Sequence, residues 1–180
     1  GAHAHQVRFA LYQQWLADRQ LAAAARHARE RGLALGFFRD LAVGAAPDGA
    51  EVWADPSAVA RGVAIGAPPD PFSMAGQNWN LPPPNPEALL ASACAGFGDL
   101  VAANMRHAGA LRIDHVMGLS RLFWIPDGAA AADGAYVRYP LDALLAVLAI
   151  ESARARCLVV GEDLGTVPEG FRERLGEVDV

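Results

Sequence analysis

Two short apolar runs of the sequence end in carboxylates whose spacing suits acid–base or nucleophilic chemistry. The first is ALRIDHVMG, in which Arg112 and Asp114 lie two residues apart. Residues two apart on a strand share a face, so this guanidinium and this carboxylate should project together. The second is CLVVGEDLG, where an apolar run leads to Glu162 and Asp163. Carboxylates at the ends of two buried strands are typical of an α/β active site.

Such a pair of carboxylates suits the cleavage of a glycosidic bond. One group attacks or supports the sugar, and the other transfers a proton. The nucleophile has to stay ionised, and a neighbouring Arg112 favours that role for Asp114. The proton donor needs a drier setting, and the apolar residues before Glu162 favour that position. We therefore expect Asp114 as the nucleophile and Glu162 as the acid.

Spacing alone leaves two alternatives open. A metal-dependent barrel enzyme would use carboxylate and imidazole ligands for a divalent ion, namely Asp114, His115, Glu162 and Asp163. The third possibility is a piece of a protein that binds carbohydrate without catalysing a reaction on it.

The bulk composition is that of a globular protein of one domain. The 180 residues are 53% hydrophobic and 19% charged, with a net charge of −5. An acidic balance is unfavourable for nucleic acid or an anionic membrane surface, so neither is expected as a partner. Cys94 and Cys157 are the only cysteines, and free thiols are expected rather than a disulfide framework.

The expected compartment is the cytoplasm. The first residues, GAHAHQVRF, lack the apolar core of a signal peptide. No apolar run approaches the roughly 20 residues that a membrane-spanning helix needs. No cofactor is expected, and the sequence does not indicate an oligomeric state.

The elements that would position the carboxylates alternate between helices and short strands. Helical periodicity covers 7–31, 86–107, 141–156 and 168–175, and short strands are expected at 33–38, 110–115 and 157–160. In the first helix an apolar stripe should face the core; it consists of Phe9, Tyr12, Trp15 and Leu16. A parallel sheet requires this order, because each return crossing needs a helix.

Charged residues fall at the carboxyl end of each predicted strand. Arg39 and Asp40 follow the first strand, Asp114 lies at the end of the second, and Glu162 follows the third. In a (β/α)8 barrel that edge carries catalysis. A complete barrel has eight strands in roughly 250 residues. The fold class is therefore α/β, a fragment of a (β/α)8 TIM barrel with about three consecutive βα units. Residues 1–180 would be its central part, with the N- and C-terminal parts of the barrel absent.

The segment 41–85 is predicted to be a long ordered loop that covers a substrate. It is rich in Gly and Pro, and only AEVWADP indicates a short helix. Loops of this length are functional, disordered or misassigned. Trp53 and Trp79, with few charges around them, argue against disorder. Trp and Asn side chains suit a sugar, whose faces stack on aromatics while its hydroxyls form hydrogen bonds.

A set of motifs runs through nearly all of 7–175 in a fixed order. They are FFRDLAVG with AEVWADP, GAPPD followed by GQNW, LRIDHVMGL with the Ile-Pro at 125–126, YVRYP, and VVGEDLGTVP. In this combination the sequence resembles the 4-α-glucanotransferases of glycoside hydrolase family 77, the amylomaltases or disproportionating enzymes. The resemblance implies a retaining, α-amylase-like barrel that acts on α-1,4-glucans and maltooligosaccharides, with no cofactor or metal ion.

The resemblance also implies roles for individual residues. Asp114 matches the nucleophile that forms a covalent glucosyl-enzyme, Glu162 the general acid/base, and Arg112 the arginine that contacts the nucleophile. Positions that line the sugar subsites are matched by Asp40, Asp70, Trp79 and His115. Trp79 falls in the mobile loop associated with the acceptor side.

The sequence departs from the family pattern in three respects. Asn80 stands where Gly is common, so the loop's shape or its acceptor preference is expected to differ. Phe38 stands where Tyr is frequent. The family's third catalytic Asp has no counterpart after Glu162, so we expect it to lie outside this chain. Residues 1–180 alone are accordingly predicted to be inactive.

Overall fold

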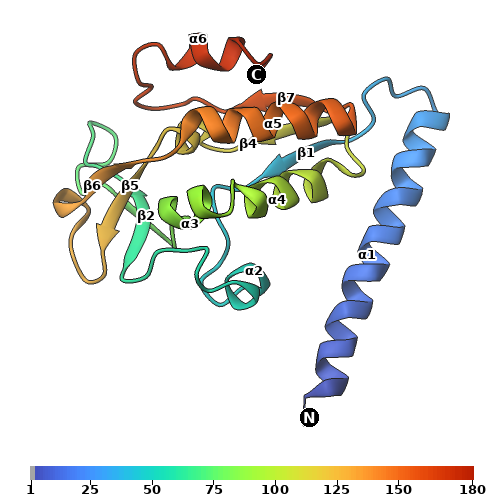
Figure 1. Cartoon of the computed structure of the whole chain (residues 1–180), viewed down its shortest axis with the longest axis horizontal. Coiled ribbons are helices and arrows are strands. Elements are labelled where there is room, and N and C mark those ends of the chain that lie inside the picture. The colour runs from blue at the N-terminus through green and yellow to red at the C-terminus, as the bar shows by residue number, and fades with distance from the viewer. Residues whose placement is uncertain (1–2) are drawn as a thin grey trace.

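The computed structural model describes residues 3–180 and contains two sheets (Figure 1). One is a three-stranded parallel sheet of order β1-β4-β7. Its strands are β1 (Phe38–Leu41), β4 (Ala110–Ile113) and β7 (Leu158–Gly161). The prediction of an α/β fold with a parallel sheet is confirmed. Asp40 lies opposite Arg112 in the register of β1 and β4.

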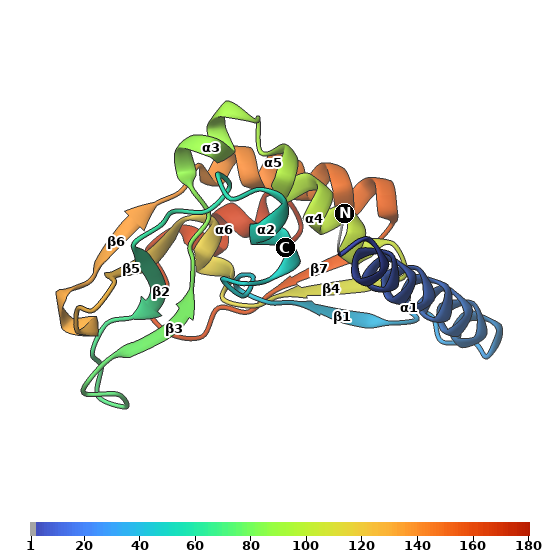
Figure 2. The ribbon, with the colours of Figure 1, turned by 90° about the horizontal axis from the view of Figure 1, so that it is seen from below.

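Helices cover one face of the parallel sheet (Figure 2). They include α3 (Pro86–Ala91), α4 (Ala95–Met105) and α5 (Leu141–Ala155). The core between them and the sheet contains Leu111 of β4, Val101 of α4 and Leu148 of α5, each fully buried. Each such side chain contributes about 1.5–3 kcal/mol relative to exposure. The short helix α6 (Phe171–Gly176) adds buried Phe171 and Leu175 to the same core.

The other face of the parallel sheet is open in the part of the chain that the structure describes (Figure 2). Phe38, Leu158 and Val160 lie on it with exposed fractions of 61%, 58% and 46%. Side chains alternate along a strand, so Asp40 and Arg112 belong to this face as well. The open face therefore carries both apolar side chains and the charged residues of the motifs.

The first helix, α1 (Ala4–Glu30), projects from the rest of the molecule (Figure 1). Only Ala25 is buried on it, and Phe9, Tyr12 and Trp15 are each more than half exposed. The prediction that this apolar stripe faces the core is wrong, because no other described element packs over it. The helix is held by Asp18, whose Oδ1 lies 2.8 Å from His107 Nε2.

A four-stranded antiparallel sheet of order β3-β2-β5-β6 flanks the parallel one. Its strands are β2 (Val63–Ala67), β3 (Gln77–Leu81), β5 (Arg121–Pro126) and β6 (Ala135–Arg138). The prediction that 41–85 has little regular structure is therefore wrong. That segment contains β2, β3 and the expected short helix α2 (Ala50–Ala54). The pairing of β2 with β5 joins segments far apart in sequence, which local patterning does not reveal.

Some predicted boundaries also shift. The first strand is at Phe38–Leu41 rather than 33–38, so Arg39 and Asp40 lie within it. The predicted helix 86–107 is interrupted at Ala93 and Cys94, both of which have a positive φ. Asn85 caps α3, because its Oδ1 accepts a hydrogen bond from the amide of Glu87 at 3.0 Å.

Two 3₁₀ helices complete the described elements, η1 (Val116–Leu119) and η2 (Ala131–Asp133). Cys94 and Cys157 are free thiols, as predicted. Both are buried, and burial raises the pKa of both. A search of residues 3–180 for a helix with the length and apolar character of a membrane span finds none.

Candidate active site

Arg112 joins two carboxylates on the open face of the parallel sheet. Its Nη1 donates to both oxygens of Asp40, at 2.7 and 2.8 Å, and its Nη2 donates to Asp114 Oδ1 at 2.7 Å. These charge-assisted bonds, with the Asp40 bond as the largest cause, raise the pKa of Arg112. The expected pairing of Arg112 with Asp114 is confirmed. Asp40 reaches the site through Arg112, and its contact with a sugar stays a prediction.

Backbone hydrogen bonds place Asp114 directly after β4. Its amide donates to the carbonyl of Leu41 at 2.9 Å, which extends the pairing with β1 by one residue. The next residue, His115, adopts a left-handed conformation with φ of +50°. Such a conformation is uncommon outside glycine and is found at functional sites. The turn aims the amide of His115 at the neighbouring strand end.

Glu162 receives that amide and is fixed from both sides. Its Oε2 accepts from the amide of His115 at 2.9 Å, and its Oε1 accepts from the amide of Leu164 at 2.7 Å. Its own amide donates to Ile113 at 2.9 Å. Both carboxylate oxygens of the half-buried Glu162 are therefore held at the end of β7, next to the end of β4. Glu162 is more exposed to solvent than the apolar residues before it predict.

A glycine allows the two strand ends to approach. Gly161 immediately precedes Glu162, and a Cβ built on it would lie 2.9 Å from Cγ1 of Val116. The amide of Val116 donates to the carbonyl of Glu162 at 2.8 Å. Any larger residue at Gly161 would push η1 away from β7 and separate the turn that carries Asp114 from Glu162.

Trp79 of β3 lies beside His115. Their ring centroids are 5.3 Å apart at an interplanar angle of 82°, an edge-to-face contact. The indole Nε1 donates to Gln77 Oε1 at 3.0 Å. Burial lowers the pKa of His115 and outweighs the charges of Glu162 and Asp114, which raise it, so the imidazole stays uncharged to a lower pH than in an exposed histidine. The segment 41–85 thus reaches the site through Trp79.

Asp70 stands apart from this cluster. It lies in the connection between β2 and β3, where its Oδ1 accepts from the amides of Phe72 and Ser73 at 2.7 Å each. This is the geometry of an Asx turn, in which an aspartate closes its own loop. Within residues 3–180 its side-chain hydrogen bonds stay inside that turn. Its assignment to a sugar subsite stays a prediction.

The ligand set of the metal alternative is not assembled. Across the described residues, no group of three or more His, Cys, Asp or Glu side chains is arranged to hold a metal ion. Asp163, one of the four candidate ligands, forms an ion pair with Arg172 instead, with Oδ2 and Nε 2.5 Å apart.

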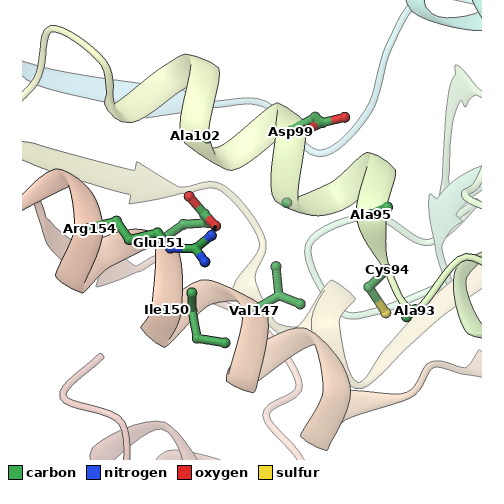
Figure 3. Close-up of a pocket in the computed structure, with 10 residues that line it drawn as sticks. Ala93, Cys94, Ala95, Asp99, Ala102, Val147, Ile150, Glu151 and Arg154 are labelled. Carbon is green, nitrogen blue, oxygen red and sulfur yellow. Dashed lines mark hydrogen bonds and ion pairs between the residues drawn. The ribbon is translucent and has the colours of Figure 1, made fainter.

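A separate groove of about 400 Å³ lies between α4 and α5 (Figure 3). Its lining includes Cys94, Asp99 and Val147, together with the Glu151–Arg154 ion pair. None of the predicted site residues lines it. The groove is formed by the helix layer and takes no part in the arrangement at the strand ends.

Two supporting residues were not predicted from the sequence. Gln77 orients the indole of Trp79, and its position two residues earlier on the same strand face was a usable signal. Arg121 donates from Nη2 to the carbonyl of Thr166, in the loop after Glu162, at 3.3 Å. No local pattern connects those two residues, which are 45 positions apart.

Comparison with known proteins extends over the whole chain. A family model described as 4-alpha-glucanotransferase matches residues 1–180. A curated relative of that name from Haemophilus influenzae is 52% identical over 178 residues, covering 99% of this chain and 26% of the relative. One from Mycobacterium tuberculosis is 49% identical over 173 residues, covering 96% and 24%. The chain thus spans about a quarter of the length of these relatives.

Solved structures of two amylomaltases are also similar to this chain. An amylomaltase from Corynebacterium glutamicum superposes with a TM-score of 0.92 at 38% identity, covering 96% of this chain and 24% of that protein. An amylomaltase from Streptococcus agalactiae in complex with acarbose has a TM-score of 0.70 at 26% identity, covering 78% and 30%.

Proposed function

Because the chain belongs to glycoside hydrolase family 77, the 4-alpha-glucanotransferases, we propose that it supplies two catalytic carboxylates of a retaining transferase. The enzyme would move a segment of an α-1,4-glucan to a new acceptor, either glucose or another glucan. The observation that carries this proposal is the turn after β4, in which Asp114 is bound by Arg112 and the next amide binds Glu162.

In the proposed mechanism Asp114 attacks the anomeric carbon of the donor while Glu162 protonates the departing glycosidic oxygen. The C–O bond to the leaving chain breaks as the bond to Asp114 forms. Glu162, now ionised, then takes the proton of an acceptor hydroxyl, whose oxygen displaces Asp114. Arg112 holds Asp114 in place and balances its charge before attack, while Asp40 holds Arg112.

The substrate class is supported by the aromatic contact at the site and by one neighbour. Trp79 offers an apolar ring beside His115, suited to the face of a sugar. The Streptococcus agalactiae amylomaltase was solved with acarbose. We propose that α-1,4-glucans and maltooligosaccharides bind here, with His115 at a sugar subsite and 41–85 covering the acceptor side against water. A cytoplasmic location also stays a prediction.

The open sheet face supports the proposal that the chain is a fragment of a (β/α)8 barrel. In such a barrel helices lie outside, and the opposite face of each strand points inward. Phe38, Arg112 and Val160 occupy that opposite face here. The remaining strands and the third catalytic Asp would come from sequence outside residues 1–180.

Transfer is tested by incubating the full-length protein that carries this sequence with maltotriose. Glucose and a ladder of longer maltooligosaccharides are expected. Glucose and maltose alone would make the protein a hydrolase, and binding without products would favour the carbohydrate-binding alternative. Activity should survive EDTA. A loss restored by a divalent ion would favour the metal alternative.

A further inference from the structure

Arg121, the first residue of β5, lies between the loop that follows Glu162 and the strand β6. Its Nη2 donates to the carbonyl of Thr166 at 3.3 Å. Its guanidinium carbon lies 4.1 Å from the ring centroid of Tyr136, a cation–π contact. Phe123 packs against Tyr136 edge to face, with centroids 5.1 Å apart. The guanidinium is thus held on an aromatic support and aimed at one backbone carbonyl.

This arrangement is not the one that stability alone would favour. The Nε of Arg121 is buried and forms no hydrogen bond with the described residues. A buried donor without a partner is destabilising. An apolar side chain of similar length, such as methionine, would fill the same space without that defect. The guanidinium is therefore better explained by what it positions.

The segment that it positions is 164–166, three exposed residues in the loop that follows Glu162. Leu164 is 79% exposed, and a Cβ at Gly165 would meet nothing within 4 Å. Glu162 depends on this loop, because its Oε1 accepts from the amide of Leu164. Arg121 holds the loop two residues further on, at Thr166.

We propose that Arg121 is a positioning residue for Glu162 and acts through the carbonyl of Thr166. The inference rests on the proposed function, in which Glu162 gives a proton to the leaving sugar and later takes one from the acceptor. Without Arg121 the loop moves, the amide of Leu164 moves with it, and the carboxyl of Glu162 loses its alignment. Asp114 is held by other contacts and keeps its place.

The test compares two donors in the full-length enzyme carrying Arg121→Met. Cleavage of maltotriose needs a proton on the departing sugar oxygen. The fluoride that leaves α-maltosyl fluoride is weakly basic, so its departure needs little help from an acid. General acid catalysis supplies on the order of 10²–10⁴-fold, so its partial loss should lower kcat/KM for maltotriose about tenfold or more. The kcat/KM for fluoride release should fall less than about threefold, because it reports only the attack by Asp114.

Arg138→Met is the matched control. Arg138 lies opposite Arg121 in the register of β5 and β6, and it is exposed. Arg138→Met should leave kcat/KM unchanged for both donors. If Arg121→Met is recovered unfolded, as judged by thermal unfolding, Arg121→Lys is compared on the same two donors. Lysine keeps the charge but loses the planar fork, so the same selective loss is expected.

An equal loss on both donors would overturn the positioning role and leave Arg121 as a structural residue. Unchanged rates on maltotriose would overturn it as well. These outcomes differ from failure of the proposed function, which would show as an absence of transfer by the unsubstituted enzyme and would remove this inference with it.

Discussion

Arg112 connects the carboxylates of Asp40 and Asp114. Its Nη1 donates to both carboxylate oxygens of Asp40, and its Nη2 donates to one oxygen of Asp114. The second contact was predictable from sequence, because the two residues are two apart on one strand. The first was not, because it depends on the parallel register of strands 72 residues apart. Nothing local in FFRDLAVG indicates that Asp40 lies opposite Arg112.

Asp40→Asn should lower activity through Arg112. The asparagine side chain keeps the shape of aspartate but carries no charge. The guanidinium of Arg112 therefore loses the ion pair with Asp40 that fixes its direction toward Asp114. Misalignment of a reacting group costs on the order of 10²-fold, so we expect a loss of kcat approaching that size. Asp48→Asn, at an exposed carboxylate in the loop after β1, is the control. Equal kinetics for Asp40→Asn and wild type on maltotriose would exclude this positioning role.

His115 should titrate below its ordinary pKa of 6.5, since burial is the largest influence on it. Its folded-state pKa is lower than its unfolded value, so the unfolded state binds the proton more readily below pH 6.5. Stability is therefore unaffected by this group above 6.5 and declines as the pH falls below it. NMR titration of the His115 ring in the full-length protein measures this, and a pKa above 6.5 would contradict it.

The predicted helices agree with the structure more closely than the predicted strands do. Asn85 and Pro86 begin α3, and α5 ends within a residue of its predicted limit, because caps and helical periodicity are local. The antiparallel strands within 41–85 and 120–138 were missed, because each is defined by a distant partner. The first strand was predicted too early in the chain. The prediction relied on Leu33 and Leu35 being buried, and both are more than half exposed.

The strand β3 ends in a conformation that fits its departure from the family pattern. Asn80 has a φ of +56°, in the left-handed region where glycine is favoured and asparagine is tolerated. Its amide donates to Asn78 Oδ1 at 2.9 Å, which closes the turn. Asparagine therefore supports a backbone conformation that glycine also adopts, and the backbone next to Trp79 is not expected to change shape.

Trp79→Ala in the full-length protein should shift the reaction from transfer toward hydrolysis. Without the indole, the acceptor loses an apolar surface and water gains access to the covalent intermediate. We expect the ratio of longer products to free glucose from maltotriose to fall several-fold, which corresponds to the roughly 0.5–1.5 kcal/mol of one aromatic contact. Trp53→Ala, at a tryptophan of α2 that is 79% exposed, is the matched control. An equal product ratio in both variants would count against the covering role.

The uncovered surfaces of the described chain are as informative as its core. One face of the parallel sheet is open, β1 and β7 are its two edges, and the aromatic stripe of α1 is exposed. Exposed apolar faces and free strand edges favour association. The alternation of helices and strands predicts a barrel fragment, and the open face with its charged residues supports that proposal.

Residues 1–180 expressed alone should therefore be inactive and prone to aggregate. The proposed third carboxylate would be missing, and loss of one member of a cooperating set removes most of the rate. Size-exclusion chromatography and a maltotriose assay of the isolated chain, beside the full-length protein, check both statements. Ordinary disproportionation by a monomer of this length would show that the site is already complete.

If this chain carries both the nucleophile and the acid/base of a retaining transfer, the covalent intermediate can be trapped on Asp114. In full-length protein with Glu162→Gln, α-maltosyl fluoride should still glycosylate the enzyme, while the missing base slows release to an acceptor. Peptide mapping by mass spectrometry should then find one maltosyl group on Asp114. The double variant Asp114→Asn, Glu162→Gln should carry none. A label on another carboxylate, or inverted product without any covalent adduct, would contradict the assignment.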